Sequence, residues 1–281
     1  MPHYYLRFCA GIFASLLFVN SATSAEMQET KFDWSKPQTF KVQVSKNQTF
    51  DLTFSNNLFK IAIGKQKLQI LLDNTKPDND FAGTGLVRIG DLNFDGYNDI
   101  AIDTSIGYGG VNVFSRIFFW QPSNGQPNKG QFSEGLDISN FGLDTATKEL
   151  TSDYKSGPFH YRDSYRFDAQ GPYKYKEIVS PGPVEIVSFF NREGKRIKRI
   201  LADTTRENLG DYTPAVLSIV EKTFLYSKPV EDAKTKAYLI KGDKVEMLDV
   251  SEYPYRWYKI RYKGKKTLVR WIKTNAVDNG Y

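Results

Sequence analysis

The stretch GDLNFDGYNDIAI, residues 90–102, places a loop rich in Asp and Asn directly before a strand-like segment. Loop positions 1, 3, 5 and 9 are Asp91, Asn93, Asp95 and Asp99. With the backbone carbonyl of Tyr97 at position 7, this spacing directs oxygen atoms at a hard cation such as Ca2+. Gly96 at position 6 supplies the positive φ of a sharp turn. The loop therefore predicts a calcium site, and the alternative is a polar turn that binds nothing.

The residues around this loop predict strands rather than helices. Position 12 of the loop is Ile102 and not Glu, which weakens the reading as a helical calcium motif. Short apolar or alternating runs follow one another along the chain, and they are 40–44, 49–54, 58–63, 67–72, 86–90, 99–103, 111–120, 161–167, 173–179, 183–190 and 196–202. We expect a loop at 122–131 and at most one helical turn within 144–156. The fold class predicted is all-β.

The N-terminus has the pattern of a cleaved signal peptide. An apolar run from Phe8 to Val19 is followed by small residues that end at Ala25. No later run approaches the roughly 20 apolar residues of a membrane helix, so we expect export to the periplasm with no membrane span. The chain has one Cys and two His, and cleavage would remove Cys9 and His3. Disulfide, zinc and thiol chemistry are then excluded, and any metal must have oxygen ligands.

Charge and composition divide the remaining chain into two domains. The polar segment 204–214 ends in Pro, which favours a boundary there. We therefore expect a signal peptide at 1–25, a calcium-binding β domain at 26–212 and a small barrel at 213–281. Residues 216–281 carry 14 Lys and Arg against 8 Asp and Glu, so the net charge of +6 belongs to the C-terminal part. Such a module suits an anionic envelope polymer, and nucleic acid is not expected outside the cytoplasm.

The first domain resembles known exported bacterial proteins. The loop at 91–99 followed by a strand resembles the calcium hairpin of FG-GAP repeats. Together with KSGPFHYRDSYRF (155–167), it resembles a family that includes an immunity protein against a lysozyme-like effector of a type IV secretion system. The resemblance implies a calcium-binding β domain, either propeller-like or an inhibitor-like sandwich. It also implies an inhibitory loop, here comprising Ser156, Gly157, His160 and Tyr161, although an ordinary Gly-Pro turn explains the same residues.

The last 60 residues or so resemble a bacterial SH3 domain. The resemblance rests on KTFLYSKPVEDAKTKAYLIKGDKVEMLD (222–249) and RWYKIRYKGKKTLVRWIKTNAV (256–277). Strand alternation places Tyr258 and Ile260 on the inner side, which leaves Trp257 outside. An aromatic groove for peptidoglycan would then comprise Tyr226, Tyr255, Trp257 and Trp271. Packing within the barrel is the alternative role of each ring, and peptidoglycan binding follows only from the resemblance.

Three functions remain open from the sequence. The preferred one is a non-catalytic periplasmic inhibitor or immunity protein, whose partner is a lysozyme-like peptidoglycan hydrolase and whose SH3-like domain contacts the wall or a protein. The second is an envelope- or peptidoglycan-binding accessory protein with no inhibitory role. The third is a hydrolase, for which the chain offers little: there is no GxSxG elbow and no P-loop, and His160 is the one histidine left after cleavage.

Overall fold

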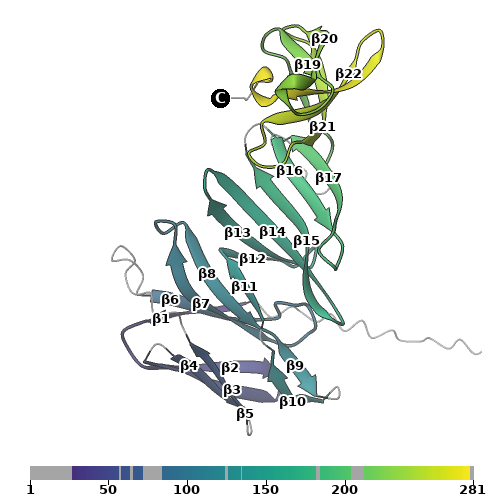
Figure 1. Ribbon diagram of the computed structural model, residues 1–281. Coiled ribbons are helices and arrows are strands. Elements are labelled where there is room, and N and C mark those ends of the chain that lie inside the picture. The colour runs from purple at the N-terminus through teal and green to yellow at the C-terminus, as the bar shows by residue number, and fades with distance from the viewer. Residues whose placement is uncertain are drawn as a thin grey trace, which may run out of the picture.

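The computed structural model describes residues 27–56, 58–63, 66–71, 84–123, 126–133, 135–181, 184–203 and 212–278. These residues form antiparallel sheets and two short 3-10 helices, with no α-helix among them, so the prediction of an all-β fold is confirmed. The predicted signal peptide at 1–25 lies outside the described residues. Within the described part, no helix is long and apolar enough to cross a membrane. The sheets follow one another along an elongated molecule (Figure 1).

Two sheets form a sandwich at the N-terminal end. The first has the order β1-β6-β7-β8-β11 and the second has β2, β3, β4 and β5 in chain order. Their bounds are β1 Gln28–Asp33, β2 Gln38–Ser45, β3 Gln48–Ser55, β4 Leu58–Ile63, β5 Gln66–Leu71, β6 Thr84–Gly90, β7 Asp99–Gly107, β8 Asn112–Phe118 and β11 Leu136–Ser139. Alternate side chains such as Val42, Leu52 and Ile102 are fully buried in one shared core. Of the two predicted alternatives, the sandwich describes these sheets and the propeller does not.

The segment 122–131 was predicted to be a loop, and the structure corrects this. It forms most of a hairpin of β9 (Trp120–Ser123) and β10 (Gln126–Phe132). Trp120 and Phe132 pair across the hairpin with ring centroids 5.2 Å apart, and both are buried. Gly130 is needed because a Cβ there would lie 2.7 Å from the Trp120 ring. The burial of these two rings outweighs the turn-forming composition of the segment.

A six-stranded meander occupies the middle of the molecule. Its strands are β12 Phe141–Asp144, β13 Glu149–Ser156, β14 Phe159–Asp168, β15 Gly171–Ser180, β16 Val184–Phe190 and β17 Arg196–Asp203. The helical turn expected within 144–156 is absent from these described residues, because Leu150 and Ser152 are buried at the two-residue spacing of a strand. Lys148, with φ of 54°, closes the β12–β13 turn instead.

The C-terminal module is a second six-stranded sheet in the order β18-β21-β22-β23-β19-β20. Its elements are β18 Val216–Ser218, β19 Thr223–Tyr226, η1 Glu231–Ala233, β20 Lys234–Leu239, β21 Lys244–Val250, β22 Trp257–Lys263, β23 Thr267–Lys273 and η2 Thr274–Ala276. Tyr258 and Ile260 point into its core, as the alternation predicted. A bridge between Ile219 and Val277 brings the beginning and end of the module together.

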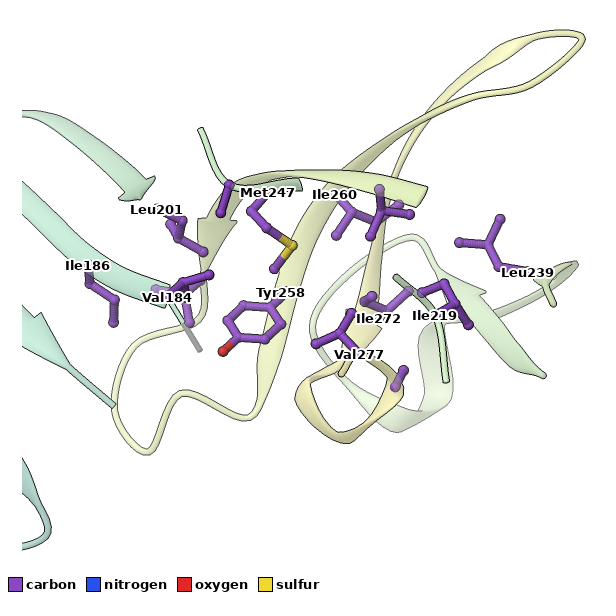
Figure 2. Packing of buried hydrophobic residues seen from close by; sticks show 14 of the residues in the cluster. Val184, Ile186, Leu201, Ile219, Leu239, Met247, Tyr258, Ile260, Ile272 and Val277 are labelled. Carbon is purple, nitrogen blue, oxygen red and sulfur yellow. The ribbon is translucent and has the colours of Figure 1, made fainter. Parts of the chain in front are cut away.

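The middle sheet and the C-terminal module share one hydrophobic core. The backbone N–H of Ala215 donates to Leu201 of β17, and the Ala215 carbonyl accepts from Met247 of β21, with both distances 2.8 Å. Figure 2 shows Leu201 and Val184 on the side of the sheet that faces Met247 and Tyr258, and all four side chains belong to one buried cluster. The expected boundary at 204–214 falls mostly outside the described residues. The first residues described after this gap run alongside β17 and pack against it.

Candidate functional site

The Asp-rich loop lies where the sandwich meets the middle sheet. Asn98 ties it to β2 by donating to the carbonyls of Gln43 and Val44 at 2.7 and 3.1 Å. Phe94 contacts Phe167 of β14 with ring centroids 6.2 Å apart. Gly96 has φ of 91°, which confirms the predicted turn at position 6. The loop is therefore fixed to both of its neighbours.

Two of the predicted ligands keep acceptor capacity for a cation. The carboxylate of Asp91 accepts the backbone N–H groups of Asp95 and Gly96, each at 2.9 Å and on a different oxygen. Asp95 accepts from Tyr97 N at 2.9 Å and from the Asn93 amide at 3.0 Å. Since each carboxylate oxygen has about two lone-pair sites, Asp91 and Asp95 are both able to accept further contacts. These oxygen donors suit a hard cation.

Asp99 has a different environment from the other predicted ligands. It is fully buried, and its two oxygens accept the N–H groups of Leu92 at 2.9 Å, Asn93 at 3.2 Å and Trp120 at 2.8 Å. Burial raises the pKa of Asp99 well above its usual range; the Trp120 N–H opposes this, and the charges of Asp95 and Asp91 add to it. Asp99 thus joins the loop to the start of β9 in addition to any contact with a metal.

The acidic side chains of the loop do not form a complete set of metal ligands in the structure. Within the described ranges, no three Asp, Glu, His or Cys side chains converge as a metal-ligand group. Burial, which is the larger cause, and the nearby charge of Asp91 raise the pKa of Asp95. A divalent cation would relieve that repulsion, and Asp91, Asn93, Asp95 and the Tyr97 carbonyl would hold it. The loop fits calcium in donor type, with Asp99 committed to the backbone.

The predicted inhibitory residues lie at the tip of the β13–β14 hairpin. Ser156, Gly157 and Pro158 are exposed, and Gly157 has φ of 56°. Strand alternation separates the remaining two residues. His160 is exposed on one face, opposite Lys155 in the register, while Tyr161 lies on the other face and stacks on Tyr154 at 5.0 Å. The four residues share one hairpin tip but do not form a single contact face.

Both neighbouring modules brace this tip. From the sandwich, the hydroxyl of Tyr108 donates to the Gly157 carbonyl at 2.5 Å. From the C-terminal module, Tyr255 and Tyr253 contact Phe159 with ring centroids at 5.7 and 6.4 Å. Tyr108 and Tyr255 both have positive φ, 56° in each case, which is uncommon for aromatic residues. The exposed turn is therefore held in one conformation from two sides.

Three of the four aromatic residues predicted for the C-terminal groove lie together. Tyr226 contacts Trp257 edge-to-face at 4.7 Å and pairs with Trp271 in the β19–β23 register. Trp257 is 8% exposed, so it is not the outward ring that alternation predicted, but it lines a cavity of ≈520 Å³. Lys273 lies 5.9 Å from the Trp257 ring centroid and forms an ion pair with Glu231 at 2.8 Å across this cavity. Neither Tyr226 nor Trp271 lines this cavity.

Tyr255, the fourth predicted residue, is separate from that groove. Its ring lies at the boundary with the middle sheet, where it packs against Phe159 and lies 5.9 Å from Tyr253. Its role is to brace the β13–β14 tip rather than to line the cavity beside Trp257. The backbone of Tyr255 is left-handed, so the chain changes direction at this residue. The sequence placed Tyr255 only two residues before Trp257 and did not indicate this turn.

The sequence interpretation missed the residues that hold the turns at the two ends of β14. Tyr108 stands in the Gly-rich turn IGYGG (106–110), which reads as a plain turn. Arg192 stands in the β16–β17 turn and donates to Gln170 at 2.6 Å and to Asp168 at 2.8 Å. An aromatic residue among glycines was the one available signal for Tyr108.

The chain matches no protein-family model, and no curated protein or solved structure is significantly similar to it.

Proposed function

We propose that this chain is an exported, non-catalytic binding protein that inhibits a lysozyme-like peptidoglycan hydrolase. The observation that carries the proposal is the braced turn at Ser156, Gly157 and Pro158. A turn that is already rigid loses little conformational entropy when it enters an enzyme cleft. Its exposed hydroxyl and the nearby imidazole of His160 are suitable partners for catalytic carboxylates. Arg162, exposed on the same strand face as His160 and paired with Asp153 at 2.7 Å, adds a charged polar contact beside the turn.

The C-terminal module supports a second part of the proposal, which is recognition of the wall or of a protein. The cavity beside Trp257 joins an aromatic ring to the charged pair of Glu231 and Lys273. Peptides that carry both charges and apolar side chains suit such a groove. We propose that the module is SH3-like and places the inhibitory turn near peptidoglycan. An accessory protein that binds the wall without inhibiting an enzyme is the second candidate, and this groove favours it.

The inhibitory role is tested by hydrolysis of purified peptidoglycan by lysozyme-like enzymes of the periplasm, with and without the full chain. We expect the full chain to inhibit the enzyme, and we expect inhibition to fall when Ser156→Ala and His160→Ala are combined. Both side chains are exposed and neither is needed for packing, so the variant should fold normally. Glu193→Ala, in the exposed β16–β17 turn, is the matched control and should inhibit normally. Full inhibition by the double variant would contradict the assigned turn. Release of fragments by the protein alone would contradict the non-catalytic role.

The calcium site is tested by thermal unfolding with calcium against chelator. For a weak extracellular-type site with Kd of about 10⁻⁴ M, about 10 mM calcium stabilises the folded state by roughly 2.7 kcal/mol. Asp91→Asn combined with Asp95→Asn should remove this shift, while Asp51→Asn on β3 should retain it. A melting temperature that is identical with calcium and with chelator would exclude the site.

A further inference from the structure

A second cavity lies at the other end of the β13–β14–β15 meander, away from the inhibitory turn. Its volume is ≈710 Å³, within the roughly 300–1,000 Å³ of typical ligand pockets. It is bounded by the Asp-rich loop, the start of β9 and the β14–β15 turn. Strand β14 spans ten residues, Phe159–Asp168, so the turn and the cavity are about 30 Å apart at the usual strand rise. The two sites are therefore separate surfaces.

The side chains around this cavity define the ligand that would fit. Phe167, which is partly exposed, contributes aromatic surface and packs edge-to-face on the buried Phe119 with ring centroids 5.3 Å apart. Carboxylates and amides complete the polar part, including Asp168, Gln121 and Gln170. No Lys or Arg is found among the described lining residues, which disfavours phosphate, sulfate and other anions. Amide groups both donate and accept, as hydroxyl groups do, and aromatic rings cover the apolar face of a sugar ring.

One wall of the cavity is rigid before any ligand arrives. Arg192 donates to the Asp168 carboxylate at 2.8 Å, to the Gln170 side chain at 2.6 Å and to the Gly171 carbonyl at 3.2 Å. The guanidinium lies 5.2 Å from the centroid of the Tyr173 ring. These contacts fix the β14–β15 turn, so its polar groups are oriented toward the cavity at little further cost in entropy.

The geometry points to a binding site for a neutral oligosaccharide, with Phe167, supported by the buried Phe119, against a sugar ring and with Asp168, Gln121 and Gln170 hydrogen-bonded to hydroxyl groups. This site goes beyond the proposed inhibition, because it uses none of the residues of the Ser156–Pro158 turn. The full chain could then hold a glycan strand at the cavity while the turn engages an enzyme.

The test is an NMR titration of the full chain with chitotetraose and, in parallel, with cellotetraose, each up to about 10 mM, which detects affinities weaker than 1 mM. We expect shifts confined to residues around Phe119, Phe167 and the β14–β15 turn. Asp168→Asn and, on the opposite wall, Gln121→Ala should each weaken binding about tenfold. Asp51→Asn is the control and should bind normally. Gln121 is exposed, so its replacement does not threaten folding.

Several outcomes would overturn the inference. These are the absence of shifts with both oligosaccharides, unchanged affinity in the Gln121→Ala variant, and shifts that appear only with peptidoglycan stem peptides. The result is scored separately from the other proposals, although Asn93 and Asp95 of the cation site also line the cavity. Saccharide binding without inhibition would refute the inhibitory turn alone, and saccharide binding without a calcium-dependent melt would refute the cation site alone.

Discussion

Replacement of Leu201 by Ala tests whether the middle sheet and the C-terminal module are one folding unit. Leu201 is fully buried on β17, within a cluster that also contains Met247, Tyr258 and Ile272 of the C-terminal module. A buried Leu→Ala change costs about 2–5 kcal/mol through lost transfer energy and the remaining cavity. For a chain of this size, that corresponds to a fall in melting temperature on the order of 10 °C. The destabilisation should reach the C-terminal module although the substituted residue lies outside it.

The assay is thermal unfolding followed by fluorine NMR of the 5-fluorotryptophan-labelled protein. The chain has four Trp residues, of which Trp34 and Trp120 report on the sandwich while Trp257 and Trp271 report on the C-terminal module. In the Leu201→Ala protein, the Trp257 and Trp271 signals should melt early. The matched control is Leu52→Ala, the same deletion in the sandwich core, which shares no residue with the boundary cluster. Wild-type melting of Trp257 and Trp271 in Leu201→Ala would refute the shared core.

Two further substitutions test interactions within the N-terminal half. Asp103→Ala should destabilise the protein by about 3–5 kcal/mol, because the buried carboxylate accepts from Arg88 and Ser115 at 2.7 Å each and from Leu86 N at 2.9 Å. Denaturant unfolding measures this cost. The control is Asp51→Ala, which breaks an exposed ion pair with Lys41 worth roughly 0–1 kcal/mol, and an equal cost for the two variants would contradict the prediction. Gly96→Ala should cost about 1–2 kcal/mol because of its φ of 91° and should reduce the calcium-dependent shift in melting temperature, whereas an unchanged shift would show that the loop conformation is not needed for the cation.

Local patterns in the sequence predicted most of the strands, and long-range pairing explains the errors. The segment 58–63 is β4 with the expected bounds, and Phe59 and Ile61, two residues apart, are both buried. Strand β1 was missed because Gln28–Lys31 are all exposed, and it exists through pairing with β6 more than 50 residues later. In segment 122–131, Pro, Asn and Gly indicated a loop, but the burial of Trp120 and Phe132 made a hairpin.

The same distinction applies to the candidate site. The spacing of Asp91 to Asp99 predicted the turn at Gly96, since a turn depends only on neighbouring residues. The sequence did not show that Asp99 would accept the N–H of Trp120, 21 residues away. Nor did it show that Tyr255 and Tyr108, from different modules, would meet the same hairpin. Contacts of this kind depend on how the sheets pack, and no local pattern records them.

The middle sheet would allow the two proposed binding sites to operate from one chain without a hinge. Strand β14 is hydrogen-bonded to β13 on one side and to β15 on the other for nearly its whole length. Lys174 of β15 also links Asp163 of β14 to Glu177, at 3.3 and 3.0 Å. A strand paired on both edges keeps its length, so the exposed turn at its beginning and the cavity at its end stay at a fixed separation. Because the strand does not bend, a ligand at one end does not change the conformation of the other end. An enzyme at the turn and a glycan in the cavity should therefore bind independently.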